Sequence, residues 1–206
     1  MKESLQKSVN SMTVNSAYLQ TSPEQDGWIF FRRWAANPLR MGSIIPSSPA
    51  LARRVARALE AGPEEYILEL GAGTGAITRG LIAAGIRPER LVVVEIESAL
   101  AEHLRAALPG ATVLEGDARA PGLLPARLRG RIGDVICGIP LVLQPLATQR
   151  RFIDAMAAAA PGRGFLHYSY CVTSPLPMRR HGLAGRRAGW TAANFPPASV
   201  WRYRPR

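Results

Sequence analysis

Hydrophobic and polar positions follow two patterns from residue 66 to the end of the chain. Short apolar runs predict strands at 66–70, 91–95, 111–115, 133–138, 163–171 and 198–204. Apolar positions at helical spacing predict helices at 75–84, 97–108 and 146–160, with a short one near 122–129. Because strands and helices alternate, we expect a mostly parallel sheet with helices on both faces. The last two strands are not separated by a long helix, so the last one is expected to be an antiparallel strand at the far end of the sheet.

A further helix is predicted before the first strand and runs to about residue 60. Ser48 is a typical N-cap residue, and Pro49 suits the first helical position. The pattern has two sides. The residues expected to face the core are Leu51, Val55 and Leu59, and those expected to face solvent are Arg53, Arg54 and Arg57.

Aromatic residues and arginines are crowded together in residues 27–36. The aromatic and aliphatic members are Trp28, Ile29, Phe30, Phe31 and Trp34, and Arg32 and Arg33 lie between them. This mixture is typical of a helix that lies in a membrane interface. A helix that docks on the domain core has the same composition, and both interpretations remain open. Residues 1–23 are polar and are expected to form a disordered leader.

A glycine-rich turn joins the first predicted strand of the sheet to the helix that follows. It carries Gly71, Gly73 and Gly75 in the spacing G-x-G-x-G, and Glu69 stands two residues before the first glycine. Glycines allow a ligand to approach the backbone, and the helix N-terminus presents free N–H groups. A carboxylate beside that terminus suits a ligand with a cationic amino-acid end better than it suits a pyrophosphate. A turn without a ligand is the alternative.

Two more acidic residues end neighbouring strands, where ligands of open α/β sheets bind. Glu95 ends the second strand and can accept hydrogen bonds from both hydroxyls of a ribose, with Ile96 beside it. Asp117, between Gly116 and Ala118, can accept the amino group of an adenine, or can simply stabilise a turn. Together with Glu69 and the turn that includes Thr74, these residues are similar to the S-adenosylmethionine site of class I methyltransferases.

The loop after the fourth strand is the predicted place of the methyl acceptor. Its residues are Cys137, Gly138, Ile139, Pro140 and Leu141, and its backbone carbonyls can receive an amine. Methyltransferases that act on adenine carry an aromatic residue here, which stacks on the flipped base. This chain has leucine at that place, which argues against a nucleobase as the substrate.

Two phenols follow in the next strand. Tyr168 and Tyr170 share one face of it, where they could take or orient an amine proton, or hold a methylated ammonium by cation–π attraction. Simple packing of the sheet is the alternative. The segment from Ser174 to Pro197 lacks helical periodicity and is predicted to be a long loop over the site. Its arginines suit the recognition of a phosphate, again against the alternative of a solvated basic loop.

The composition limits the classes of function. The net charge is +11, and the last 46 residues hold eight arginines and no acidic residue, which implies an anionic surface or substrate. Two cysteines in apolar runs favour a reducing compartment over a disulfide framework. With two cysteines and three histidines, the sequence shows no metal-ligand cluster, and no apolar run approaches the ~20 residues of a membrane span.

The flanking motifs resemble those of bacterial phospholipid N-methyltransferases, which convert phosphatidylethanolamine to phosphatidylcholine. The likeness covers roughly residues 26–206. The phospholipid N-methyltransferases in turn resemble the ribosomal RNA adenine dimethylases. Besides the glycine turn, it rests on Phe31-Arg32-Arg33-Trp34, Pro38-Leu39-Arg40-Met41-Gly42, Pro46-Ser47-Ser48, Gly138-Ile139-Pro140-Leu141, Tyr168-Ser169-Tyr170, Asn194-Phe195-Pro196-Pro197-Ala198 and Val200-Trp201.

The resemblance implies a fold and a set of roles. The fold is a Rossmann-like class I methyltransferase with a mostly parallel seven-stranded sheet, preceded by an amphipathic helix; residues 24–62 cover the cofactor site and residues 63–206 form the catalytic domain. Further cofactor contacts are expected at Met41, Gly42, Ser47, Ser48 and Gly138. Substrate contacts are expected at Ile139, Pro140, Leu141, Arg179, Arg180 and Arg186, and membrane contacts at Trp28, Phe31, Arg32, Arg33 and Trp34.

The implied reaction is direct displacement, in which the lipid amine attacks the methyl group of S-adenosylmethionine and S-adenosylhomocysteine leaves, without a metal. The implied protein is a cytoplasmic monomer, bound peripherally to anionic lipid at the inner face of the cell membrane, with no nucleic-acid partner. Two alternatives remain open: an RNA adenine methyltransferase, favoured by the charge, and a non-catalytic membrane- or nucleotide-binding module.

Overall fold

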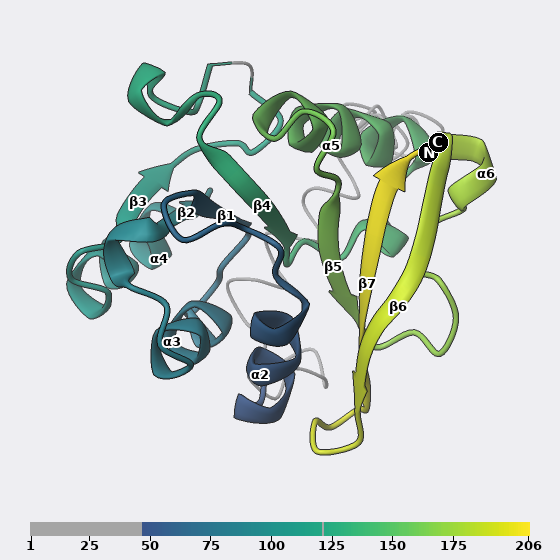
Figure 1. Cartoon of the computed structure of the whole chain (residues 1–206), viewed down its shortest axis with the longest axis horizontal. Coiled ribbons are helices and arrows are strands. Elements are labelled where there is room, and N and C mark those ends of the chain that lie inside the picture. The colour runs from purple at the N-terminus through teal and green to yellow at the C-terminus, as the bar shows by residue number, and fades with distance from the viewer. Residues whose placement is uncertain (1–46, 121) are drawn as a thin grey trace, which may run out of the picture.

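The computed structural model describes residues 47–120 and 122–206 of the chain. They form a seven-stranded sheet with the order β3-β2-β1-β4-β5-β7-β6 (Figure 1). The strands are β1 Tyr66–Leu70, β2 Leu91–Glu95, β3 Thr112–Glu115, β4 Ile132–Cys137, β5 Phe165–Ser169, β6 Leu183–Thr191 and β7 Ala198–Pro205. The first five strands are parallel, and β7 is antiparallel to both β5 and β6. The five parallel strands therefore end at one edge of the sheet, which we call the carboxyl edge.

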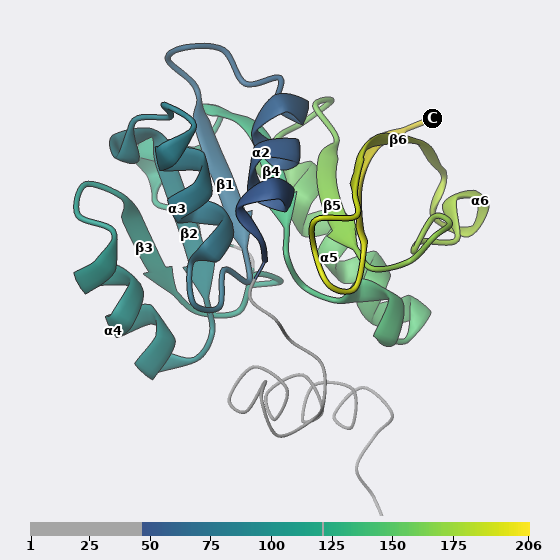
Figure 2. The same ribbon diagram turned by 90° about the horizontal axis from the view of Figure 1, so that it is seen from below.

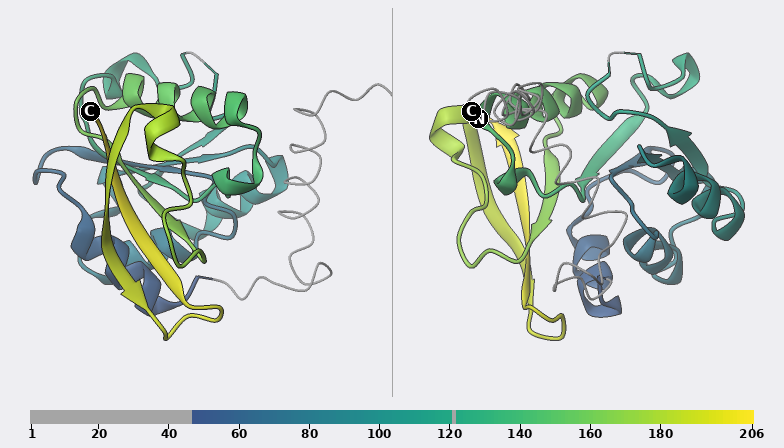
Figure 3. Two further views of the ribbon diagram at one scale, coloured as in Figure 1. Left: turned by 90° about the vertical axis from the view of Figure 1, so that its right-hand side faces the viewer. Right: turned by 180° about the vertical axis from the view of Figure 1, so that it is seen from behind.

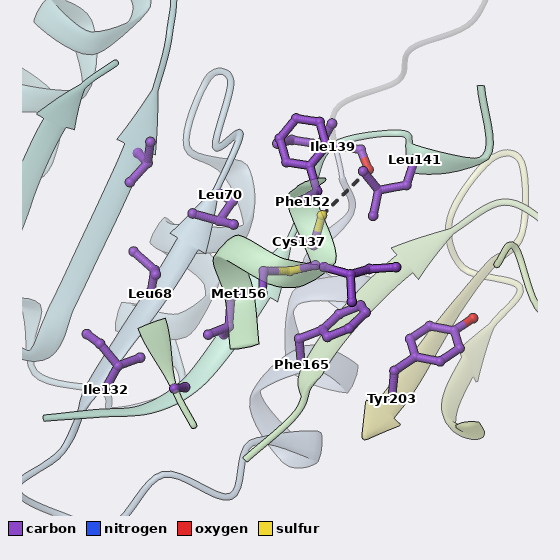
Figure 4. Close-up of a cluster of buried hydrophobic side chains, with 14 of the residues drawn as sticks. Leu68, Leu70, Ile132, Cys137, Ile139, Leu141, Phe152, Met156, Phe165 and Tyr203 are labelled. Carbon is purple, nitrogen blue, oxygen red and sulfur yellow. Dashed lines mark hydrogen bonds between the residues drawn. The ribbon is translucent and has the colours of Figure 1, made fainter. Parts of the chain in front are cut away.

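Helices cover both faces of the sheet (Figure 2). The helices are α2 Pro49–Ala58, α3 Ala76–Ala83, α4 Ser98–Ala107, α5 Leu146–Ala159 and α6 Met178–His181, with short 3-10 turns at Pro88–Arg90, Ala126–Leu128 and Leu141–Leu143. Leu51 of α2 and Leu81 of α3 pack with Ile136 and Val200 on one face, where Leu104 of α4 also lies. Phe152 and Met156 of α5 pack on the other face (Figure 4). Two apolar layers thus enclose the sheet.

The first helix follows the sequence pattern closely. The hydroxyl of Ser48 accepts a hydrogen bond from the Leu51 amide at 3.2 Å, so Ser48 is the N-cap. Leu51 and Val55 are fully buried, whereas the three arginines of α2 are exposed. The Ser48 amide also donates to Oδ1 of Asn194 at 2.8 Å, which ties the start of α2 to the β6–β7 connection. The helix therefore begins at the carboxyl edge.

Two predictions about the C-terminal part are wrong. Residues 174–197 are not a long loop, because they contain α6 and the nine-residue strand β6. Strand β7 is antiparallel as predicted, but it lies between β5 and β6, so that β6 forms the edge (Figure 3). The pattern of β6 is hidden by glycines, by paired arginines and by a register shift between Arg187 and Gly189. The helix predicted near 122–129 is only the 3-10 turn Ala126–Leu128.

Candidate active site

The glycine turn adopts a backbone that only glycine accepts readily. Gly71, Gly73 and Gly75 have φ values of 73°, 57° and 77°, and Gly75 is the N-cap of α3. A Cβ on Gly71 would lie 2.7 Å from Cγ1 of Ile139, whereas nothing lies within 4 Å of a Cβ on Gly73. The turn is therefore packed at Gly71 against the loop Gly138–Leu141, which we call the acceptor loop after its predicted role. It is open at Gly73, as a ligand that approaches the backbone requires.

The backbone holds the carboxylate of Glu95 in a fixed position. Its Oε2 accepts a hydrogen bond from the Gly73 amide at 2.8 Å, and its Oε1 accepts from the amides of Ile96 and Glu97 at 2.8 and 3.1 Å. A carboxylate has about four acceptor positions, so one remains on Oε2. To bind both hydroxyls of a ribose, Glu95 would exchange one of these backbone bonds, and that from Gly73 is the nearest candidate because Gly73 faces open space.

Glu69 is a buried carboxyl group with one unused oxygen. Thr78 of α3 donates to Oε2 at 2.6 Å, and Oε1 has no hydrogen-bond partner among the described residues. The pKa of Glu69 is raised to about 7, mainly by burial; the hydrogen bond from Thr78 opposes this shift and the charge of Glu95 adds to it. A cationic ligand group that donates to Oε1 would satisfy this atom and favour the ionised form. The residues present therefore fit the amino-acid end of S-adenosylmethionine.

The predicted adenine side of the site is partly occupied by an ion pair. Asp117 accepts from the Arg119 guanidinium at 2.6 to 3.0 Å and from the Arg119 amide at 2.8 Å. Burial alone would raise the pKa of Asp117, but the hydrogen bonds and charge of Arg119 hold it below its ordinary value. The Arg119 guanidinium also lies over the ring of Phe152, 5.6 Å from its centroid. A role for Asp117 towards adenine stays a prediction, and sequence spacing gave no sign of this arginine.

Several of these residues line one small cleft at the carboxyl edge. Its walls come from the ends of β1, β2 and β3, from the acceptor loop and from α5, through the residues Gly71, Val94, Glu95, Ile96, Gly116, Asp117, Ala118, Ile139 and Phe152. Seven of the predicted site residues are thereby brought together from distant parts of the chain. The sequence analysis missed two members, Val94, which lies inside the buried run of β2, and Phe152, which lies inside the helical pattern of α5.

The acceptor loop lies directly beside the glycine turn. The Gly138 amide donates to the carbonyl of Leu70 at 2.8 Å, and a Cβ on Gly138 would lie 2.7 Å from the carbonyl oxygen of Gly71 and 2.5 Å from the phenol oxygen of Tyr168. Glycine is therefore required where the loop, the turn and the phenol meet. Leu141 points into the core rather than into the cleft (Figure 4), so the prediction that its side chain contacts the substrate is not supported.

The two phenols form a small cluster with Ser47. Burial, and then the nearby Glu69, Tyr170 and Cys137, raise the pKa of Tyr168 well above its ordinary value, while a hydrogen bond with Ser47 lowers it. Burial also raises the pKa of Tyr170, which shares the Ser47 hydroxyl. Both phenols are therefore neutral at physiological pH and can donate or accept a hydrogen bond. This state suits the orientation of an amine better than the removal of its proton.

The structure does not bring the predicted substrate arginines to this cleft. Arg179 and Arg180 lie on α6, just before the first residue of β6. The start of β6 pairs with the end of β7, and the end of β7 pairs with the start of β5. These two arginines are thus at the edge opposite the carboxyl edge. Arg186 is bonded to Glu60, which follows α2. The proposed phosphate contacts of these three arginines are not supported. The predicted residues that lie outside the described residues are Met41, Gly42, Trp28, Phe31, Arg32, Arg33 and Trp34.

The chain is similar in sequence to several proteins of known name. The chain is 31% identical over 131 residues to an ornithine lipid N-methyltransferase of Singulisphaera acidiphila, covering 61% of this chain and 68% of the relative. It is 30% identical over 122 residues to a ribosomal RNA small subunit methyltransferase A of Chlorobium phaeobacteroides, covering 56% of this chain and 44% of the relative. No protein-family model matches the chain.

This chain belongs to the family of S-adenosylmethionine-dependent methyltransferases that includes the lipid N-methyltransferase of Singulisphaera. Its fold is that of magnesium protoporphyrin IX methyltransferase from Synechocystis, solved with S-adenosylmethionine bound, at a TM-score of 0.58 and 15% identity over 93% of this chain and 100% of that one. The predicted class I methyltransferase fold and the predicted cofactor are therefore confirmed. The methyl acceptor is a separate question, because relatives that act on lipid and on RNA both match.

Proposed function

We propose that this methyltransferase transfers methyl groups to the amino group of a membrane lipid, with phosphatidylethanolamine and its mono- and dimethyl forms as substrates on the way to phosphatidylcholine. The observation that carries the proposal is the acceptor loop. The loop has leucine where an adenine methyltransferase needs an aromatic residue, and Leu141 is buried in the core. The named lipid N-methyltransferase among the relatives supports the same class of acceptor.

The residues of the site suggest how a lipid amine would be received. Carbonyl oxygens of the loop Gly138–Leu141 can accept its N–H groups, and the neutral phenol of Tyr168 lies against that loop. The methyl group comes from the sulfonium centre of S-adenosylmethionine, which is an electrophile. The burial that raises the pKa of Tyr168 would also favour the neutral form of an amine beside it, which is the form that can attack. Positioning of the amine is then the main contribution of the protein.

The proposal includes a place for the reaction. Residues 28–34 would bind peripherally at the cytoplasmic face of a membrane, and the positive charge of the chain would favour anionic lipid. Within the residues that the structure describes, no helix is both long and apolar enough to cross a bilayer.

An RNA adenine methyltransferase is the second candidate. The net charge of +11 and the ribosomal RNA methyltransferases among the relatives favour it. The missing aromatic residue in the acceptor loop argues against it. The two candidates predict different products, a methylated lipid that enters an organic extract and a methylated RNA that does not.

The test uses the full chain with radiolabelled S-adenosylmethionine and four separate acceptors: vesicles of phosphatidylethanolamine, vesicles that contain ornithine lipid, vesicles of phosphatidylcholine alone, and total RNA. We expect label in the organic extract of the phosphatidylethanolamine vesicles, with mono-, di- and trimethyl products in mass spectra. Label from ornithine lipid alone would keep a lipid amine as the acceptor but replace phosphatidylethanolamine. Label only in RNA would overturn the proposal in favour of the second candidate.

A further inference from the structure

The exposed large hydrophobic side chains of the described residues gather at one place. Val142, Leu143 and Leu146 follow β4, and Tyr170 and Val172 follow β5. Trp190 and Phe195 lie at the end of β6 and in the β6–β7 connection. Because β7 is antiparallel to both β5 and β6, this connection also lies at the carboxyl edge (Figure 1). We call this set of residues the apolar rim: Val142, Leu143, Leu146, Tyr170, Val172, Trp190 and Phe195.

The segments that carry the apolar rim contain no charged residue. Residues 138–149, 164–178 and 188–201 hold no Asp, Glu, Lys or Arg, although 20% of the whole chain is charged. A surface that binds nucleic acid needs arginines or lysines that contact phosphates. The rim lies at the same edge as the acceptor loop, and its own segments offer no such contacts, so their chemistry fits an apolar partner.

The rim has the features of a surface that enters a membrane interface. Val172 and Phe195 are 81% and 73% exposed, and exposed apolar side chains grouped in this way mark an interaction surface. Trp190 and Tyr170 are the aromatic types that favour the level of lipid head groups. Arg54 is exposed next to Gly189 and so flanks the rim, and Arg79 is exposed at the same edge of the sheet, where it donates to the carbonyl of Thr74. These positive charges complement lipid phosphates.

We propose that the apolar rim inserts shallowly into the interface of a lipid bilayer and so brings the methyl-transfer cleft to the lipid head groups. This inference rests on the proposed function, and it names the part of the folded domain that docks. Gly138 and Tyr168 lie at the same edge as the rim, so a head group at the membrane surface reaches them without leaving the bilayer. This contact is additional to the membrane contact expected of residues 28–34.

The first test measures insertion site by site. Leu143→Cys or Val172→Cys is introduced in a Cys171→Ser background and labelled with an environment-sensitive dye; Cys137 is fully buried, and burial raises its pKa to about 12, so it does not react. We expect a blue shift of the emission at both positions when vesicles of phosphatidylethanolamine with one-third phosphatidylglycerol are added. A label at exposed Glu89, at the opposite edge, should not shift.

Two outcomes of this test would overturn the proposal. One is unchanged emission at positions 143 and 172 while the protein sediments with the vesicles. The other is a blue shift that appears without vesicles and grows with protein concentration, because a second copy of the chain would then cover the rim.

The second test separates the rim from the proposed function. The triple variant Leu143→Ser, Val172→Ser and Phe195→Ser should bind the same vesicles roughly tenfold or more weakly at high salt, since it loses apolar insertion. The control Ala83→Ser, Ala107→Ser and Ala157→Ser changes exposed residues near the far ends of helices and should bind like the unmodified chain. Activity on lipid in detergent micelles should survive in the triple variant and fall only on vesicles. Equal vesicle binding by both variants would overturn the proposed role of the rim but leave the proposed function intact. Absence of lipid methylation both in micelles and on vesicles would overturn the proposed function.

Discussion

Arg202 on β7 and Asp134 on β4 form a buried ion pair, although β5 lies between these two strands in the sheet. Nη1 and Nη2 of Arg202 donate to Oδ1 and Oδ2 of Asp134 at 2.5 and 2.7 Å, and both side chains are at most 2% exposed. Nη2 of Arg202 also donates to the carbonyl of Ala58 at 2.5 Å, and the Glu60 amide donates to Asp134 at 2.8 Å. The pair thus joins the end of α2 to the middle and the antiparallel end of the sheet.

This pair leads to a prediction about stability. Asp134→Asn leaves the Arg202 charge buried without its partner, and we expect the free energy of unfolding to fall by about 3–5 kcal/mol. The control is Asp154→Asn, which removes one partner of the Arg150–Asp154 pair, whose side chains are 56% and 57% exposed; its expected loss is under about 1 kcal/mol. Urea denaturation measures both. Similar losses in the two variants would show that the buried pair has no special role.

Glu95 leads to a prediction about cofactor affinity. Glu95→Ala removes a charged acceptor that the backbone holds in place, which should weaken S-adenosylmethionine binding by ~10- to 150-fold, equivalent to about 1.5–3 kcal/mol. Glu102→Ala, on the exposed side of α4, is the matched control and should leave the affinity unchanged. Titration calorimetry on the folded variants decides the matter. Unchanged affinity in Glu95→Ala would show that the ribose is bound elsewhere.

Glu69 leads to a prediction about pH. Its pKa is raised from an ordinary 4.5 to about 7, so between these values the folded protein keeps a proton that the unfolded chain has released. The stability from Glu69 is therefore complete below the lower pKa and is lost as the pH rises through the upper one. His167, whose pKa burial lowers to about 4, changes stability in the opposite direction over part of this range. A comparison with Glu69→Gln isolates the contribution of Glu69.

The measurement is urea denaturation of the ligand-free protein at several pH values. The free energy of unfolding of the unmodified chain, minus that of Glu69→Gln, should fall by up to about 1.4 kcal/mol per pH unit between the two pKa values. Parallel pH profiles of the two proteins would rule out the raised pKa. Cofactor binding near the upper pKa should also release a proton in the unmodified chain but not in Glu69→Gln, which calorimetry in buffers of different ionisation enthalpy detects.

The sequence predicts the parts of this protein in which one local rule decides the structure. The N-cap at Ser48, the glycine turn and the buried runs of β1, β2 and β4 follow from such rules, and the structure has them at the predicted places. The strand β6 was not predicted, because its stability comes from pairing with β7 and not from its own hydrophobic pattern. The positions of Arg179 and Arg180 were predicted wrongly for the same reason, because they precede this unpredicted strand and therefore lie at the edge opposite the carboxyl edge.

Ion pairs and ring contacts between residues far apart in the chain could not be predicted from the sequence either. Asp134 reads as a polar interruption of a buried strand, and only the fold shows that Arg202, 68 positions later, neutralises it. The ion pair between Asp117 and Arg119 is local, but its place beside the ring of Phe152 is not. A sequence shows which residues carry chemistry, whereas their partners depend on register and topology. Seven of the predicted cofactor and acceptor residues were nevertheless brought into one cleft.

Tyr168 and Tyr170 lead to the last prediction, which concerns turnover. Both phenols have raised pKa values and share the hydroxyl of Ser47, but Tyr168 is the one whose oxygen lies against Gly138. If Tyr168 orients the amine by one neutral hydrogen bond, Tyr168→Phe removes roughly 1 kcal/mol of transition-state stabilisation and lowers turnover about fivefold. Tyr170→Phe should have a smaller effect, and neither variant should change the affinity for S-adenosylmethionine.

The matched control is Tyr203→Phe. Tyr203 is a buried phenol hydrogen-bonded to Ser174 at 2.8 Å, and its strand position pairs with the start of β5, away from the carboxyl edge. This variant should keep full turnover, although it loses a buried hydrogen bond. The size of the effect in Tyr168→Phe then separates two roles, since loss of a proton-transfer group lowers rates by ~100-fold or more. Full turnover in both single variants and in the double variant, measured with detergent-dispersed phosphatidylethanolamine, would show that the two tyrosines only pack the sheet.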